Sequence, residues 1–534
     1  MCGCKTSLVL AAFIFSSLVS QAQPYYDLIG RTALWSTTTN INGSGIRVGQ
    51  PEANYVQNAE PSVFEVNPAN QSQPVSLFTY ISADGIANTF TNTVGVESSH
   101  GERVANYFYS VWYGMATNVL HVDNYDADYY ITNYLANYDP AQNDLVVNQS
   151  YTYGFLSVAD QEQVDSMYDN YEEMYRTLFV SAVGGGPTSS NAYAPGTSYN
   201  GISVGVYDNI SGAFFNNIGP TIDNGRCKPD ITALEGATSF STPQVSGASA
   251  DLMQAALRGD GGSDTNSAFD LRTIKALLLN GAVKPPGWTN ASFYPLDQRY
   301  GAGVVNVFNS YRQLTGGKNS AIVSQLITAG SSHPPTGDTG TEPVLNGWDF
   351  ATSTSSRSPA KDAVAHYYFD VSNHLAGARF TATATLAWNR QLNQTNINNL
   401  DLFLYNCANS NLVAGSTSLV NNVEHIYQPS LAQGRYDLQV WKAGGSGIVS
   451  TIEPYALAFA FYSDTLNVSG SGTNVTLTWP VYPAGFMVEN TTNLISPNWI
   501  STNLPQPVIT NNLNSLQLSA TNTVQFFRLI QPNL

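Results

Sequence analysis

The sequence predicts an α/β region with a mostly parallel sheet and helices on both faces, followed by all-β C-terminal domains of the sandwich or jelly-roll type. Up to about residue 318, strand-like segments alternate with helical ones, as in parallel sheets covered by helices. Past about residue 320, helical periodicity fades and short β patterns dominate. Charged residues make up only 11% of the chain, and Asn, Thr, Ser and Gly take their place, which favours β-rich structure with many turns.

Each element of the α/β region is predicted from its residue pattern. Runs of β-branched and other apolar residues predict strands at 45–50, 118–125, 144–151, 177–183 and 201–208. Apolar residues at helical spacing predict helices at 100–115, 159–175 and 268–282, and one more after Ser239. The spacing argument for the first helix uses Val104, Phe108, Val111 and Trp112.

The length of 534 residues predicts two to four domains at roughly 100–200 residues each. We expect a signal peptide at 1–22, an α/β domain at 23–318, a β-sandwich or jelly-roll domain at 319–463 and a small all-β module at 464–534. The predicted strands of the sandwich lie at 366–372, 380–388, 401–406 and 434–442. The segment 329–343, rich in Gly, Pro, Ser and Thr, is the most linker-like stretch.

The N-terminus is typical of a secretory signal peptide. Lys5 is followed by an apolar run from Ser7 to Val19, and the small residues Ser20 and Ala22 suit cleavage after Ala22. We therefore expect a secreted protein, extracellular or on the cell surface. No later run approaches 18 apolar residues, so no membrane span is expected.

The formal charge of −17 and the pI of about 4.6 argue against a nucleic-acid partner, because phosphate binding needs clustered Lys and Arg and the chain has no such run. The acidity is interpreted as solubility. No cofactor or metal is expected; a structural Ca²⁺ is compatible with the acidity, but the chain has no recognisable ligand loop. Beyond the predicted signal peptide only Cys227 and Cys407 remain, and we expect two free or buried thiols rather than a disulfide framework.

Ser239 lies where a Gly-bearing turn meets a predicted helix. On its own, a Ser at this place is typical of a helix cap, because its hydroxyl accepts free backbone N–H groups. A nucleophile at the same place gains N–H donors and the helix dipole for a developing oxyanion. The α/β region has two histidines: His100 starts a predicted helix, and His121 lies within a predicted strand, where a core or edge role is favoured.

Three motifs carry a family resemblance. "KPDITALEGATSFSTPQVSGASA" resembles the nucleophile block of the subtilisin-like serine proteases, with its K-P-D-I and G-T-S-x-A-x-P patterns. "SSHGERVANYF" is similar to the family's H-G-T-x-V-A-G block, and "GSGIRVGQPEAN" looks like the block that ends in the acid. The resemblance covers about residues 27–315 and implies a subtilisin-like α/β fold in a secreted bacterial type with C-terminal β-domains.

The resemblance implies a serine endopeptidase that acts on an extended polypeptide. Ser239 would be the nucleophile, His100 the general base and Glu52 the acid that orients His100. The acid position departs from the family, which has Asp; Glu52 falls there when the first strand is aligned without gaps, and Asp84 in "SADGIAN" is the rival. Residues 150–154 resemble the strand that pairs with substrate, which implies substrate contacts from Ser150, Tyr151, Thr152, Tyr153 and Gly154.

The oxyanion site departs further from the family. Where the family has an Asn, the turn "VSAVGGGPTSSN" has Gly185, which has no side-chain donor. Losing such a donor costs roughly 10²–10³ in rate. A backbone N–H of the Gly-rich turn or the side chain of Asn191 could replace the missing donor. Thr238, in the nucleophile block, is expected to support the same site. The alternative is a catalytically weak or inactive protein that acts as an extracellular binding or surface protein.

The C-terminal domains carry a resemblance of their own. The region 401–444 looks like the pre-peptidase C-terminal or P-type β-domains that follow secreted bacterial proteases. His425 in this region is interpreted as a sandwich edge residue rather than a ligand. Contact with the cell envelope or with polysaccharide is the candidate role of these domains.

Overall fold

The α/β region is built on one sheet whose long central part is parallel. The computed structural model describes residues 26–54, 59–140, 143–185, 191–208, 211–323, 326–332, 334–335, 340–372, 378–463, 465–471, 473–480, 486–501, 503–510, 513–519 and 524–530. The predicted signal peptide, residues 1–22, lies outside them. In sheet order the strands are β10 (Ala213–Phe214), β9 (Ile202–Asp208), β8 (Leu178–Ala182), β7 (Val146–Gln149), β1 (Arg47–Glu52), β6 (His121–Asp126), β3 (Phe78–Ile81) and β4 (Ala87–Asn88), with β11 (Ile231–Leu234) beside β9.

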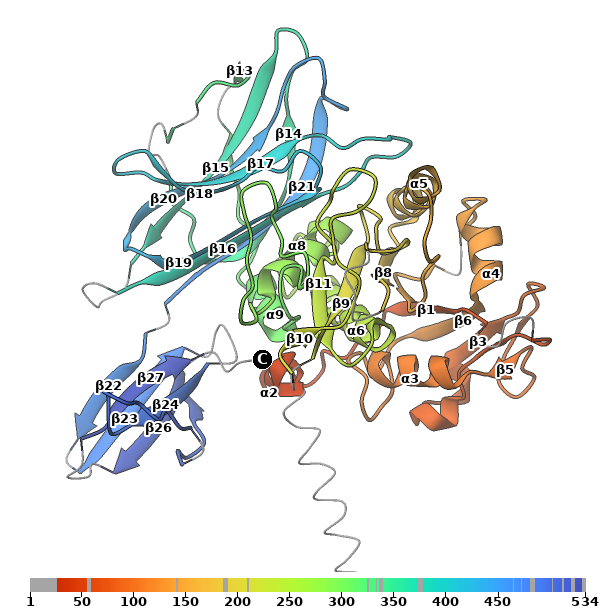
Figure 1. Ribbon diagram of the computed structural model, residues 1–534, viewed down its shortest axis with the longest axis horizontal. Helices are drawn as coiled ribbons and strands as arrows, with labels where there is room; N and C mark the ends of the chain where they lie inside the picture. Colours follow the sequence, from red (N-terminus) through yellow and green to blue (C-terminus); the bar gives the residue numbers. More distant parts are fainter. Residues whose placement is uncertain are drawn as a thin grey trace, which may run out of the picture.

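Alternating side chains of the sheet supply two cores, one on each face. Val146 of β7 and Val180 of β8 belong to the large core beneath α3 (Ser99–Phe108) and α6 (Thr238–Arg258). Their neighbours Val147 and Phe179 belong to the opposite core, with α5 (Val158–Tyr175) and the π-helical turn η3 (Tyr130–Leu135). Since successive residues of a strand point to opposite faces, apolar runs of this kind require cover on both sides. The predicted α/β fold with helices on both faces is therefore observed (Figure 1).

The helix predicted at 100–115 is shorter than expected. α3 ends at Phe108, and Tyr109 leaves the helical conformation with φ −131° and ψ 5°. The Tyr109 ring is fully buried and its hydroxyl donates to Gln50, so the chain turns at this residue. Val111 and Trp112, which the spacing placed on the buried face, are exposed instead. The predicted helix at 268–282 likewise divides into α7 (Thr265–Ala268) and α8 (Leu271–Gly281), with the Asp270 side chain capping α8.

Short elements complete the α/β region, several of them without a clear sequence signal. The helices are α2 (Arg31–Thr37), α4 (Ala127–Tyr129) and α9 (Val307–Thr315), with 3-10 turns η1 (Pro68–Gln71) and η2 (Val75–Leu77). A separate parallel pair is formed by β2 (Val63–Glu65) and β5 (Val96–Glu97). Neither Cys227 nor Cys407 is part of a disulfide; Cys227 is buried and Cys407 is partly exposed.

Two antiparallel sheets follow and pack face to face. One has the order β12 (Ile322–Val323), β15 (Lys361–Val371), β20 (Gly434–Lys442), β17 (Leu400–Asn406) and β18 (Asn411–Ser416), with β13 (Ile327–Thr328) also beside β15. The other has the order β14 (Asn346–Thr354), β21 (Ile452–Tyr462), β16 (Phe380–Trp388) and β19 (Val423–Leu431). Inward side chains such as Phe369, Leu438, Trp388 and Phe459 form one common core. The predicted sandwich is therefore present.

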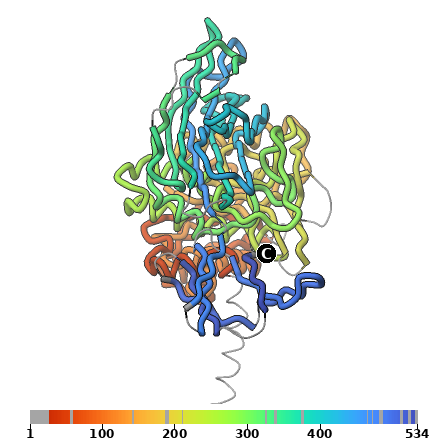
Figure 2. Tube along the Cα trace, turned by 90° about the vertical axis from the view of Figure 1, so that its left-hand side faces the viewer, coloured from red at the N-terminus to blue at the C-terminus, as the bar shows by residue number. Residues whose placement is uncertain are grey.

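The last described residues form a smaller all-β unit. Its sheets are β22 (Asn467–Ser471), β23 (Asn474–Pro480), β26 (Leu513–Ser519) and β25 (Val508–Thr510), and the pair β24 (Met487–Thr491) and β27 (Phe526–Ile530). Its small core is centred on Leu477 and Trp479. Two perpendicular views place this unit at the opposite end of the molecule from the outer tip of the sandwich (Figures 1 and 2). The domain boundaries at residues 22, 318 and 463 stay predictions.

The sandwich is held tightly against the α/β region. α8 packs on β16 and β21 of the sandwich. The Arg390 guanidinium lies 2.6 Å from Asp169 of α5, and both groups are buried. The Asn422 amide donates to the Tyr199 carbonyl oxygen at 2.8 Å. Within the described ranges no helix is long and apolar enough to cross a membrane.

Candidate active site

Glu52 and His100 meet at one end of the sheet. Glu52 is the last residue of β1, where its neighbour β6 runs parallel to it, and His100 is the second residue of α3. The Ser98 side chain caps α3 by accepting from the Gly101 N–H at 3.1 Å, which fixes the start of the helix beside the strand end. Glu52 Oε2 lies 2.8 Å from His100 Nδ1. Asp84, the rival acid, is exposed in the turn between β3 and β4.

Gln50 holds the Glu52 carboxylate in place. Its amide donates to Glu52 Oε1 at 2.9 Å and to the Gly101 carbonyl at 3.0 Å, and its own oxygen accepts from the Tyr109 hydroxyl at 2.5 Å. All these groups are buried. One carboxylate oxygen thus binds Gln50 and the other faces the imidazole, so the additional methylene of Glu relative to Asp is accommodated without a loose side chain.

The pKa of His100 is raised. Burial by itself lowers it, but the hydrogen bond and the negative charge of Glu52 outweigh burial, while Arg103 opposes them weakly. The imidazolium form is therefore stabilised at Nδ1 by Glu52. This is the electrostatic arrangement that a general base needs once it has taken a proton.

Ser239 is not the cap of its helix. The N-cap residue of α6 is Ala237, which makes no side-chain cap hydrogen bond, and Ser239 is the second helical residue. The Ser239 hydroxyl instead donates to the Ser150 carbonyl at 3.3 Å, while the Ser150 hydroxyl donates to the Ser239 carbonyl at 2.8 Å. The backbone N–H of Ser239 is in the first turn of α6, where N–H groups have no partner within the helix. Ser239 therefore combines a partly exposed hydroxyl with a helix N-terminus.

Phe240 connects the two helices that carry His100 and Ser239. Its ring centroid is 5.6 Å from the His100 ring, and the Arg103 guanidinium lies over the Phe240 ring at 3.8 Å from its centroid. Arg103 also pairs with Glu235 at 3.1 Å, and the Tyr107 hydroxyl donates to the same carboxylate. The residue after Ser239 is thus packed directly against His100.

The Gly-rich turn lies beside the start of α6. Among the described residues, a Cβ added to Gly185 would have one atom within 4 Å, Thr238 Oγ1 at 3.8 Å, so the described part of the site leaves room next to Thr238. The Asn191 amide donates to the Pro220 carbonyl at 2.6 Å and is thereby committed to holding its loop. Of the two replacements considered for the missing Asn, the backbone of the turn is the one that this contact leaves available.

Part of the α/β region matches the sequence model of a known protein family. The model of the subtilase family, peptidase S8, matches residues 98–303, which include His100 and Ser239. Residues 98–303 are thus similar to the subtilase family, and the α/β region that contains them is called the subtilase domain here. A comparison with curated protein sequences gives no match.

Solved structures similar to this chain include several proteases. A cold-adapted subtilisin-like serine proteinase is 15% identical, with 50% of this chain and 90% of that chain covered and a TM-score of 0.30. A protease of Pseudoalteromonas arctica is 16% identical over 55% and 97%, with a TM-score of 0.33. Fervidolysin of Fervidobacterium pennivorans, a keratinolytic enzyme, is 12% identical over 84% and 71%, with a TM-score of 0.32. At these scores the family assignment rests on the sequence model.

The segment predicted to bind substrate starts beside Ser239 and then turns its aromatic rings inward. β7 ends at Gln149, and residues 151–154 of the subtilase domain are partly buried without regular structure. The Tyr151 hydroxyl accepts from Gln149, and the Tyr153 hydroxyl lies 3.3 Å from that of Tyr168 in α5. Gly154, with φ +70°, has open space where a Cβ would be. The rings of Tyr151 and Tyr153 are therefore anchored on the protein side of this segment. Thr152 and Gly154 are its other two residues.

Sequence reasoning missed the residues that hold the site together. Five such residues are not among the positions that match the family motifs, and their roles depend on contacts between distant segments: Gln50, Tyr109, Phe240, Arg103 and Glu235. The place of Gln50 two residues before Glu52, on the same strand face, was the one usable signal. In the part of the subtilase domain that the structure describes, no group of three or more His, Cys, Asp and Glu side chains is arranged to hold a metal ion.

Proposed function

We propose that the chain is a secreted serine endopeptidase that hydrolyses peptide bonds of extended polypeptides through an acyl-enzyme on Ser239. The proposal rests on one observation above all: a carboxylate lies 2.8 Å from His100 Nδ1, and the His100 ring packs on Phe240, the residue after the partly exposed Ser239 at a helix N-terminus. No cofactor takes part, since side chains and backbone supply each role.

In the proposed reaction, Ser239 Oγ attacks the scissile carbonyl carbon while His100 takes the hydroxyl proton. Glu52 keeps the imidazole in the required tautomer and stabilises the imidazolium. The backbone N–H of Ser239 and of the Gly185 turn face the oxyanion. His100 then gives the proton to the leaving amine, and water, activated by His100, releases the acid product and restores Ser239.

The test is covalent labelling of the full chain with a fluorophosphonate, which phosphonylates an activated serine and releases fluoride. We expect labelling of the native chain, none in Ser239→Ala, and strongly slowed labelling in His100→Ala. Ser241→Ala is the matched control, since this buried serine of the same helix bonds only within the first turn. Labelling that persists in Ser239→Ala would refute the proposal.

A second candidate function is binding without turnover, at the cell envelope or on polysaccharide. The observation that favours it is Gly185, which leaves the oxyanion site without a side-chain donor. An unlabelled native chain that cleaves no peptide would support this reading instead.

A further inference from the structure

Two backbone segments meet at the start of α6, one from each of two neighbouring strands. β7 and β8 are parallel, so the chain leaves both at the same end of the sheet. After β7, the Ser150 carbonyl oxygen accepts from the Ser239 hydroxyl at 3.3 Å. After β8, Gly185 lies beside Thr238, whose Oγ1 is 3.8 Å from the place of a Cβ on that glycine. A carbonyl carbon within reach of Ser239 Oγ therefore lies between the Ser150 segment and the Gly185 turn.

Two consecutive residues fill the gap between these segments. The Tyr193 N–H donates to the Val183 carbonyl oxygen at 3.0 Å, which ties Tyr193 to the turn after β8. The Tyr153 N–H donates to the Ala194 carbonyl oxygen at 2.8 Å, which ties Ala194 to the segment after β7. Tyr193 and Ala194 thus form a floor for any group that enters between the two segments.

Tyr193 is a large side chain among small ones. Its neighbours in the chain are Ala192 and Ala194, β8 ends at Ala182, and all three alanines are buried. The Tyr193 ring is half-buried and lies against Gly184, where an added Cβ would be only 2.9 Å from Tyr193 Cδ2. The ring therefore occupies space next to the turn that the alanines leave.

A second side chain also packs at Gly184. The Asn217 N–H donates to the Gly184 carbonyl oxygen at 3.0 Å, and Asn217 Nδ2 is 2.7 Å from the place of a Cβ on Gly184. Gly184 has φ +96°, a left-handed conformation that favours glycine. The space beside Gly184 is therefore shared by Asn217 and the Tyr193 ring, and it has no room for a further ring.

The proposed reaction directs one substrate side chain at this floor. The acyl-side residue is the substrate residue whose carbonyl carbon Ser239 attacks. Its carbonyl oxygen points to the N–H groups of the Gly185 turn, and its backbone follows the Ser150 segment, so its side chain enters the gap between them. A large side chain there needs the space that the Tyr193 ring occupies, whereas a hydrogen or a methyl group does not.

We propose that Tyr193 restricts the acyl-side residue to Gly, Ala or Ser, so that the substrates are polypeptides with such a small residue at the cleaved bond. The inference rests on the proposed peptidase function and names its substrate class. Tyr193 is a specificity-determining residue in this proposal and takes no part in proton transfer.

The test uses the full chain and two tetrapeptide p-nitroanilides that differ only in the acyl-side residue, Ala or Phe. For the native chain we expect kcat/KM to be about 100-fold higher with Ala, within the range that pocket size gives. Tyr193→Ala should raise kcat/KM for the Phe peptide by about 100-fold and change the value for the Ala peptide little. Tyr193→Phe keeps the ring and should keep the native preference.

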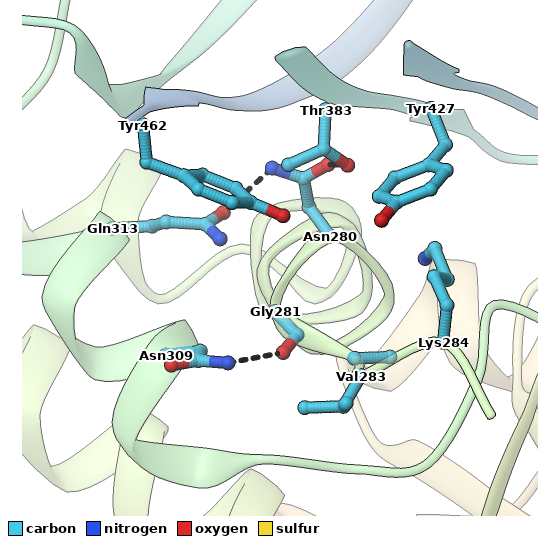
Figure 3. A pocket seen from close by; sticks show the side chains of 10 residues that line it. Asn280, Gly281, Val283, Lys284, Asn309, Gln313, Thr383, Tyr427 and Tyr462 are labelled. Carbon is cyan, nitrogen blue, oxygen red and sulfur yellow. Dashed lines mark hydrogen bonds between the residues drawn. The ribbon is translucent and has the colours of Figure 1, made fainter. Parts of the chain in front are cut away.

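Tyr427→Ala is the matched control. Tyr427 is also a half-buried tyrosine, but it lies on β19 of the sandwich, near Lys284 in the turn after α8 (Figure 3). Loss of its ring should lower the unfolding temperature without changing the preference for Ala over Phe. A preference that changes in Tyr193→Ala alone then reflects the position of the ring and not a loss of stability.

Fluorophosphonate labelling of Ser239 in each variant separates the two ways in which the inference can fail. An unlabelled native chain overturns the proposed function and this inference with it. A labelled native chain that hydrolyses the Phe peptide as well as the Ala peptide overturns the inference alone, and this comparison needs no variant to fold. A labelled Tyr193→Ala chain that keeps the native preference overturns it too.

Discussion

At the scale of single residues, the site is defined by how the Glu52 carboxylate is held. Gln50 occupies one carboxylate oxygen and is itself fixed by the buried Tyr109 hydroxyl, so the second oxygen is directed at His100 Nδ1. The sequence identified Glu52 from its place at the end of a strand, but Gln50 and Tyr109 are joined only by tertiary packing. A glutamate can therefore stand where the family has an aspartate because its neighbours restrict it.

Glu52→Gln keeps this shape and removes the charge. We expect kcat to fall by roughly 10³–10⁴, as for removal of the acid in comparable triads. The His100 pKa should fall as well, since burial then acts without the opposing carboxylate. Activity requires neutral His100, so the acid limb of the pH–rate profile moves to lower pH. A profile measured from pH 4 to 9 checks both effects, and an unmoved limb would contradict the assigned pairing.

Gly185→Asn tests the missing oxyanion donor. The position has open space beside Thr238, so an Asn side chain can be accommodated. We expect kcat to rise by about 10², the low end of what one such donor contributes. Gly184→Asn is the control, since its φ of +96° and a Cβ only 2.7 Å from Asn217 Nδ2 make it destabilising. The gain is expected in addition to the proposed backbone donors of Ser239 and the Gly185 turn, and an unchanged kcat would mean that these N–H groups alone already stabilise the oxyanion fully.

At the scale of elements, the strands were easier to predict than the ends of helices. Runs such as 201–208 are apolar and β-branched throughout, and β9 matches that range closely. The end of α3 was mispredicted, because the apolar spacing continues to Trp112 while the buried Tyr109 turns the chain. Hydrophobic periodicity shows which residues are apolar, but it does not show whether a tertiary contact of one of them ends the helix.

The contact between α3 and α6 makes a prediction at this scale. Phe240 packs between His100 and Arg103, so Phe240→Ala should leave His100 less well oriented toward Ser239. We expect kcat to fall by about tenfold with little change in KM, as expected when a positioning contact is lost. Phe240→Leu should recover most of the rate. Steady-state kinetics on one peptide substrate, with unfolding temperatures alongside, separates this effect from simple loss of stability.

At the scale of the whole molecule, the sandwich behaves as part of the subtilase domain. The sequence suggested separate domains joined by a linker, whereas buried polar side chains cross between them. Asn200 and Arg390 exchange two hydrogen bonds, and the Cys227 N–H donates to Asn421 at 2.8 Å. His425, interpreted as an edge residue, is indeed on edge strand β19 but is buried against this interface. Polar complementarity of this kind leaves no periodic signal in the sequence.

Arg390→Leu should therefore destabilise the protein strongly. It leaves Asp169 buried without its guanidinium partner, which costs about 3–5 kcal/mol. The matched control is Arg528→Leu, whose guanidinium is 46% exposed and pairs with Glu489 in the small C-terminal unit, and for which about 0–1 kcal/mol is expected. Chemical denaturation of both variants checks the difference, and similar midpoints for the two would show that the interface contributes little.

The position of β1 in the sheet also governs when the site can form. β1 precedes β6 and β7 in the chain but lies between them, so it gains both neighbours only after residue 149 is available. Ser239 lies a further 90 residues along the chain, counted from Gln149. Because such long-range pairings form slowly, a chain that is still emerging has a histidine and an acid but no complete site. The proposed hydrolysis can therefore begin only after nearly half of the chain has emerged, which delays self-cleavage of the growing chain.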